Sequence, residues 1–165
     1  MKIYYREKSG GIEILRCFGI EGRVEIPGMI DDKLVISAAP YAFSSHMDEK
    51  EELKNASLWE VSDGLEFGRE GHVLAGNDVE EIVFPYTLKE IGRYIFYGCG
   101  NLKKLEFSDS LMQIGCGAFT GCHALEKLTV HMRQGKKSGV KEMLGEMWQR
   151  IDVNFLYKYE EARLV

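Results

Sequence analysis

The sequence predicts an α+β fold, a short solenoid with a small parallel sheet, closed by a β-hairpin at one end and a helix at the other. Three observations predict it. Two consecutive 23-residue segments repeat each other, glycines recur at fixed places within them, and both flanks carry strand or helix periodicity. The 165 residues are enough for one domain with a sizeable core.

Residues 1–22 are expected to form the β-hairpin. Apolar side chains occur over residues 3–6 and 12–17, and the intervening Ser9, Gly10 and Gly11 favour a turn. The end of a solenoid exposes apolar core, so this hairpin is expected to cap it.

The repeat itself occupies residues 79–132. Segments 87–109 and 110–132 share nine identities in 23 positions without a gap, nearly all apolar or glycine. In each, the pattern L-x-x-L-x-[F/V] places alternate side chains on one face of a short strand. A half unit begins at residue 79, and a degenerate unit covers residues 23–43. Because one unit cannot bury its apolar face alone, the units are expected to stack around a continuous core.

These residues carry a family resemblance. The pattern Ile-Gly-x-x-[Ala/Ile]-Phe-x-Gly-Cys-x-x-Leu-x-x-Leu, preceded by a strand ending in Ile-Pro or Phe-Pro, resembles the BspA-like leucine-rich repeat. It fits residues 79–132 and, more weakly, residues 24–43. The resemblance implies a curved leucine-rich repeat module that binds proteins or surface ligands, often on bacterial cell surfaces, and has no catalytic residues of its own.

Residues 44–78 form an insertion between the degenerate unit and the others. An acidic helix is expected near residues 46–55, with Ser44 or Ser45 as its cap. Two interpretations of the insertion stay open. It is either a surface loop that packs Trp59 and Phe67 onto the solenoid, or a partner-binding excursion.

Residues 133–165 are expected to form a C-terminal helix and a strand. An amphipathic helix would cover the last repeat or, alternatively, offer a methionine-rich groove to a partner. Its apolar positions are Val140, Met143, Leu144, Met147, Trp148 and Ile151. Apolar residues then continue to the last position, which favours an edge strand or a chain that continues in a longer protein.

The residues capable of chemistry do not form a recognisable reaction centre. Cys17, Cys99, Cys116 and Cys122 are too few and too irregularly spaced for a disulfide framework, and the repeat already explains the spacing of Cys99 and Cys122. That pair is interpreted either as a disulfide between adjacent coils or as buried thiols. The four histidines fit no catalytic pattern, and the glycine-rich stretches fit no phosphate-binding loop. We therefore predict no enzyme, no cofactor and no metal.

Composition restricts the partners. The net charge of −5 and isoelectric point near 5.5 argue against nucleic acid, which needs clustered cations. The basic cluster Arg133, Lys136, Lys137 and Lys141 is interpreted as a solvated loop. No secretory signal and no membrane-spanning stretch is visible, which predicts a cytoplasmic protein without membrane insertion. The alternative is the cell surface, if a leader is missing from the chain.

One candidate binding face follows from the strand alternation. Outward residues should stand in register as Glu81/Lys104/Lys127, Val83/Glu106/Thr129 and Pro85/Ser108/His131. The candidate residues are Glu81, Lys104, Glu106, Lys127, Thr129 and His131. They serve either solubility and mutual pairing or recognition. The predicted function is a non-enzymatic module that binds a protein or cell-surface ligand through this face or the inserted loop. The alternative is a structural scaffold domain of a larger protein.

Overall fold

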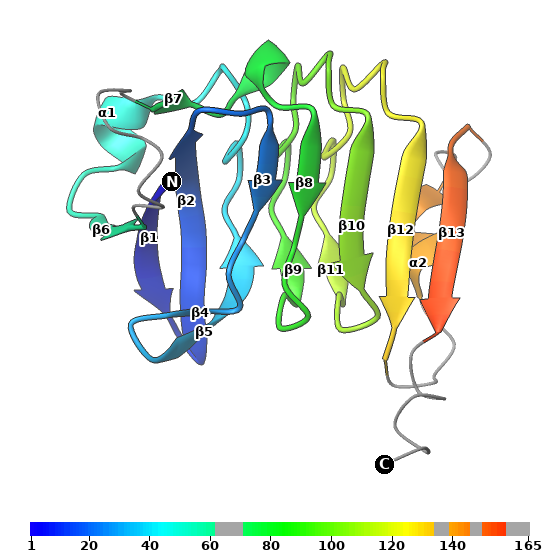
Figure 1. Cartoon of the computed structure of the whole chain (residues 1–165), viewed down its shortest axis with the longest axis horizontal. Helices are drawn as coiled ribbons and strands as arrows, with labels where there is room; N and C mark the ends of the chain where they lie inside the picture. The colour runs from blue at the N-terminus through cyan, green and yellow to red at the C-terminus, as the bar shows by residue number, and fades with distance from the viewer. Residues whose placement is uncertain (62–70, 134–138, 146–149, 158–165) are drawn as a thin grey trace.

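The structure, a computed structural model, describes residues 1–61, 71–133, 139–145 and 150–157. The chain winds into a solenoid in which two sheets lie against one shared hydrophobic core (Figure 1). The strands of one sheet stand at the front of Figure 1, and the short strands that the repeats contribute to the other sheet lie behind them. This arrangement confirms the predicted repeat solenoid.

The front sheet holds one strand from each coil, and all its neighbouring strands are parallel. Ile82, Leu105 and Leu128 occupy the same place in successive strands, as the repeat predicts. In spatial order the strands are β13 (Asp152–Tyr157), β12 (Lys127–Met132), β10 (Lys104–Ser108), β8 (Glu81–Val83) and β3 (Arg23–Glu25). The weak repeat therefore supplies β3, and the chain after the last clear repeat supplies β13.

The back of the solenoid carries a second sheet that the sequence did not predict, and the strands that the repeats contribute to it are parallel. Its repeat strands are β5 (Lys33–Ala38), β9 (Glu90–Ile91) and β11 (Gln113–Ile114). The last two have two residues each, too short to show an alternation in the sequence. A small hairpin of β4 (Met29–Ile30) with β5 accommodates the longer loop of the degenerate unit.

Aromatic side chains fill the space between the sheets. Phe43, Phe96 and Phe119 follow one another from coil to coil, with ring centroids 6.0 Å and 5.7 Å apart. Phe43 and Phe96 are fully buried, and such burial stabilises the fold by about 1.5–3 kcal/mol each. Glycine is required where the coils touch, because a Cβ on Gly115 would lie 2.2 Å from the backbone nitrogen of Arg93. The recurring glycine of the Ile-Gly pair is thus a packing requirement.

The predicted N-terminal hairpin is confirmed. Strand β1 (Lys2–Lys8) pairs antiparallel with β2 (Gly11–Gly19), and Gly10 has the φ of +91° that the tight turn needs. Strand β2 also pairs in parallel with β5, so the hairpin extends the back sheet and lies over the first coil. Ile12, Ile14 and Cys17 of β2 belong to the core.

Arg16 closes the first coil from the hairpin. Its side chain is 2% exposed, and its Nη1 donates to the carbonyl oxygens of Tyr41, Ala42 and Ser44 at 3.2, 3.1 and 2.6 Å. The other guanidinium nitrogens lie 3.0 Å from Oε1 of Glu49. Burial lowers the pKa of this guanidinium, and the pairing with Glu49 opposes that effect.

The strands of the insertion lie on the hairpin, while His46 and Asn77 contact the repeat of residues 87–109. Its strand β6 (Ser57–Glu60) pairs with β1, and β7 (His72–Val73) pairs with β2. Trp59 packs partly buried against the core, whereas Phe67 lies outside the described residues. A short 3₁₀-helix, η1 (Gly76–Asp78), leads back to β8. The strands of the insertion are therefore part of the N-terminal cap.

Neither expected helix is confirmed at its predicted length. In the insertion, helix α1 covers only Glu49–Glu52 and is capped by Asp48, so the prediction of Ser44 or Ser45 as cap was wrong. Ser44 is instead buried beside the turn that Arg16 holds. Near the C-terminus, α2 covers Val140–Leu144, and Ile151 directly precedes β13. Residues 146–149, with Met147 and Trp148, lie outside the described residues. Within the described chain, no helix has the length and apolarity to span a bilayer.

Candidate binding face

Residues of the front sheet that point away from the core form a surface that we call the outer face. Parallel pairing places Lys104 beside Glu81 and Lys127, and Glu106 beside Val83 and Thr129. Ser108 stands beside His131. These pairs are the register that the sequence predicts. The register alone does not show which of these side chains a ligand can reach.

The outer face is hollowed where the strands end. A groove of about 590 Å³ is lined by Arg23, by residues 25–28 and 83–87, and by Glu106, His131 and Arg133. It arises because β3 and β8 have only three residues, while β10 and β12 continue further. Pro27 and Pro85 follow the short strands, and proline has no N–H with which to extend a ladder. The volume lies in the range of ordinary ligand sites.

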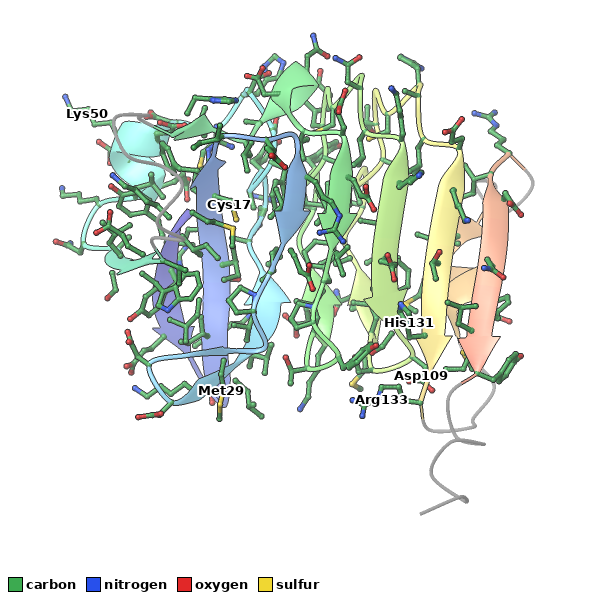
Figure 2. All side chains as sticks on the ribbon, viewed as in Figure 1. Cys17, Met29, Lys50, Asp109, His131 and Arg133 are labelled. Carbon is green, nitrogen blue, oxygen red and sulfur yellow. The ribbon has the colours of Figure 1, made fainter. Side chains whose placement is uncertain are left out.

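Tyr86 lines this groove together with Arg133 and His131. Its ring has the guanidinium carbon of Arg133 4.3 Å from the centroid, which is a cation–π contact. The ring of His131 meets it edge-on, with the centroids 5.4 Å apart. The adjoining loop is held by Thr87, whose hydroxyl donates to the carbonyl of Val35 at 2.6 Å. Figure 2 shows His131 and Arg133 near one another at the lower end of β12.

Carboxylates on this face already have partners. Oε1 of Glu106 lies 2.5 Å from Nε2 of His131, and the histidine is 8% exposed. Nη1 of Arg23 lies 3.1 Å from Oε2 of Glu25, and Nε of Arg23 lies 3.6 Å from Oε1 of Glu81. The hydrogen bond with Glu25 is the main reason that the pKa of Arg23 is raised. Among the described residues, no carboxylate lies within ion-pair distance of Lys104, Lys127 or Arg133.

The predicted face residues divide into two groups. Glu106 and His131 line the groove, whereas Glu81, Lys104, Lys127 and Thr129 do not. Lys104 and Lys127 are exposed on the neighbouring part of the face, but Thr129 is only 9% exposed because strands flank it on both sides. The sequence places residues on a face reliably, but it does not show how far neighbouring strands cover them.

Sequence reasoning missed Arg23, Tyr86 and Arg133. Arg133 was assigned with Lys136, Lys137 and Lys141 to a solvated loop, but the structure stacks it on Tyr86. Lys136 and Lys137, and the side chain of Lys141, lie outside the described residues. One sequence signal for the groove was available: Pro85 stands where the following repeats have Ser108 and His131, so the ladder must end earlier there.

The cysteines take no part in this face. Cys99 and Cys122 are buried free thiols in adjacent coils, and their Sγ atoms donate to the carbonyls of Phe43 and Phe96, each at 3.2 Å. Burial raises the pKa of both thiols to about 12. Cys17 is buried with its pKa raised likewise, and Cys116 is exposed. Within the described chain, no His, Cys, Asp and Glu side chains gather as a metal site.

Comparisons with known proteins agree with the repeat. Residues 71–140 match the family described as "BspA type Leucine rich repeat region (6 copies)". A crystal structure of a leucine-rich repeat protein of T. pallidum, TpLRR, aligns over 93% of this chain and 79% of that one, with 21% identity and a TM-score of 0.37. No curated protein matches the chain. The family match confirms the resemblance predicted from residues 79–132. Residues 71–140 of this chain are a BspA-type leucine-rich repeat region.

Proposed function

We propose that the chain is a non-enzymatic interaction module that binds a protein through its outer face. The observation that carries this proposal is the groove around Tyr86, which joins an aromatic ring, a stacked arginine and a sheet surface in one accessible hollow. Aromatic residues and arginine are the side chains most enriched at the centres of protein interfaces. Domains built from leucine-rich repeats generally bind proteins, which supports the same assignment.

The side chains of the groove favour recognition over catalysis. Glu106 and His131 are paired with each other, and the hydroxyl of Thr87 is engaged by a backbone carbonyl. A nucleophile–base pair needs a hydroxyl or thiol within reach of the base, and the buried thiols with raised pKa are poor nucleophiles. These features support a binding role without a reaction.

A differential pull-down tests the outer face. Replacing Lys104, Glu106 and Lys127 together by alanine removes exposed and half-exposed side chains, so the fold should survive, as circular dichroism can check. Proteins that the natural chain captures from lysate and envelope fractions of the source cells should be lost with this variant. The matched control is Lys89→Ala, an exposed lysine next to β9 of the back sheet. Equal capture by the triple variant and the control would refute binding through this face.

The inserted segment is tested separately, because binding through it is the other form of the proposal. Deleting the insertion is unsuitable, since β6 and β7 pair with the hairpin and Leu74 is buried. Leu58 and Val61 are 44% and 45% exposed, so Leu58→Ser with Val61→Ser changes its surface while sparing the core. Loss of capture in this variant alone would move the binding site to the insertion.

A structural scaffold role is the second candidate, and one observation favours it. Strand β13 lies at the edge of the front sheet and, among the described residues, pairs only with β12. An edge strand presents unpaired backbone groups to another strand. This role predicts that residues 1–165 capture no partner, and that a longer natural chain, if there is one, melts at a higher temperature.

We also propose a cytoplasmic location. Three buried thiols with raised pKa in a repeat core fit a reducing compartment. Fractionation of source cells with an antibody against the chain tests this, and recovery on the cell surface would contradict it.

A further inference from the structure

We propose that the segment of the partner bound at the outer face is an extended acidic peptide with two carboxylate side chains about six residues apart. One carboxylate would pair with Arg133 and the other with Lys104 and Lys127. This inference rests on the proposed function and adds the chemistry of the partner to it.

Arg133 is prepared to bind a carboxylate. Stacking on Tyr86 engages the face of the guanidinium and holds it in place. The N–H donors lie along the edge of the guanidinium plane, so stacking leaves them available for the two-pronged geometry that carboxylates match. Arg133 is exposed, and no described carboxylate lies within ion-pair distance of it. Because the stack fixes the side chain beforehand, less conformational entropy is lost on binding.

Lys104 and Lys127 form the second point of attachment. They stand directly beside each other in the parallel register of β10 and β12, and both are exposed. Like charges at such positions destabilise a sheet. Glu81, the other register neighbour of Lys104, is engaged by Arg23. Asp152 stands in register with Lys127 on β13 without forming an ion pair. A carboxylate placed between the two lysines would relieve their repulsion.

The acidic groups of the outer face favour a peptide over a continuous polyanion as the ligand. Glu25, Glu81 and Glu106 lie on the same surface as Lys104, Lys127 and Arg133, which form no ion pair with any described carboxylate, and the whole chain has a net charge of −5. A nucleic acid or acidic polysaccharide would bring a charge to every part of this surface and be repelled by those carboxylates. A peptide with separated carboxylates meets the cations and avoids the glutamates.

The spacing follows from the strand. Lys127 begins β12 and Arg133 follows its last residue, so six residues of strand separate them, or about 20 Å. An extended peptide has nearly the same rise per residue, hence the spacing of about six residues between its carboxylates. Next to Arg133, the groove offers Pro85 and Tyr86 as an apolar surface for the adjoining part of the peptide.

Selection from a displayed library of random peptides about twelve residues long, which covers the 20 Å span, tests the inference. Peptides selected on the natural chain should contain two Asp or Glu residues five to seven positions apart, and should bind more weakly as salt is added. For such a peptide, Arg133→Gln should weaken binding roughly tenfold to hundredfold, as expected for a lost charge-assisted hydrogen bond. Arg133→Lys should weaken it less, and Lys89→Gln should leave it unchanged.

A cycle of double substitutions locates the contact. Once the carboxylate nearer Arg133 is replaced by an amide in the peptide, Arg133→Gln should have no further effect, whereas Lys104→Gln with Lys127→Gln should still weaken binding. Selected peptides without acidic residues, or binding insensitive to Arg133→Gln, would overturn the acidic segment and leave the proposed protein-binding function intact. Failure to select any peptide would overturn the inference, while the pull-down still tests the function. Tighter binding of single-stranded RNA or heparin, weakened by Arg133→Gln, would replace the peptide by a polyanion.

Discussion

At the scale of single residues, Arg16 supplies hydrogen bonds that a preceding coil would otherwise supply. At the corresponding turn of the later coils, a backbone N–H of one coil donates to a carbonyl of the next. Phe43 donates in this way to Ile95, and Phe96 donates to Ala118. The first coil has no such donor before it, and Nη1 of Arg16 reaches the equivalent carbonyl of Ala42. Unpaired buried carbonyls cost free energy, so this side chain closes the stack.

Replacing Arg16 is therefore expected to destabilise the protein strongly. Arg16→Met keeps the length and apolar volume of the side chain but leaves buried carbonyls and Glu49 without their donor. We expect the free energy of unfolding to fall by about 3 kcal/mol, in line with a broken buried ion pair. Urea denaturation followed by circular dichroism measures it. Arg93→Met is the matched control, because Arg93 is exposed on a later coil. Equal midpoints for both variants would contradict the capping role.

The sequence contained no sign of this role. Arg16 lies in a strand among apolar residues, where a charged side chain is expected to point to solvent. Its partners are carbonyls near residues 41–44, and hydrogen bonds to backbone leave no pattern in the sequence. For the same reason, the sequence did not show that Tyr86 and Arg133 meet in the groove. Tyr86 and Arg133 come from coils that the repeat aligns, but their contact depends on the loop shape after Pro85.

At the scale of elements, one position in the turn of each coil determines how that turn packs against the next coil. Tyr41, Tyr94 and Gly117 are equivalent in the repeat, and all have left-handed φ angles of +59°, +50° and +65°. The rings of Tyr41 and Tyr94 stack with centroids 5.6 Å apart. A Cβ on Gly117 would lie 2.2 Å from the Tyr94 ring, so the glycine leaves space for that ring.

We expect Gly117→Ala to destabilise the protein by about 2–4 kcal/mol, as the sum of a left-handed alanine and a displaced ring. The two contributions can be separated. In a Tyr94→Ala background the ring is absent, so Gly117→Ala should there cost only the backbone part, about 1–2 kcal/mol. Thermal unfolding of the four chains of this cycle gives the coupling. Additive effects would show that ring and glycine do not interact.

Elements also differ in how well the sequence predicts them. The front strands β8, β10 and β12 were predictable with their register, because the 23-residue identity aligns them directly. The two-residue strands of the back sheet and the pairing of β6 with β1 were not, since both depend on partners distant in the chain. Helix periodicity over residues 140–151 predicted more helix than the five residues of α2. Ile151, one of the periodic positions, instead leads into β13.

At the scale of the whole molecule, the buried thiols make stability depend on alkaline pH. Burial raises the pKa of Cys17, Cys99 and Cys122 to about 12, from an ordinary value of 9.0. Between these values the unfolded chain loses thiol protons and the folded chain keeps them. The stabilisation is thus complete below pH 9 and is lost as the pH rises towards 12, by up to ~1.4 kcal/mol per thiol and pH unit.

Urea unfolding at a series of pH values above 9 should show this slope. Cys17→Ala should reduce the slope, although it also lowers stability at neutral pH by removing a buried side chain. Cys116→Ala provides the comparison, because this thiol is exposed. An identical slope for both variants would contradict the assignment of pH dependence to buried thiols. In the native protein, a thiol reagent should label Cys116 far faster than the other three.

The direction of the hydrogen bonds between coils determines where further coils can be added to the array. At the turn that contains Phe43 and Phe96, each coil donates N–H groups to the next coil and receives donors from the coil before it, and Arg16 occupies the receiving side of the first coil. An added coil before residue 23 would have to displace that side chain and separate β2 from β5. A tandem duplication at the boundary of residues 109 and 110 meets no such obstacle, since equivalent surfaces of the repeat meet on both sides. Growth by copying is therefore directional, and every copy would widen the outer face by one strand.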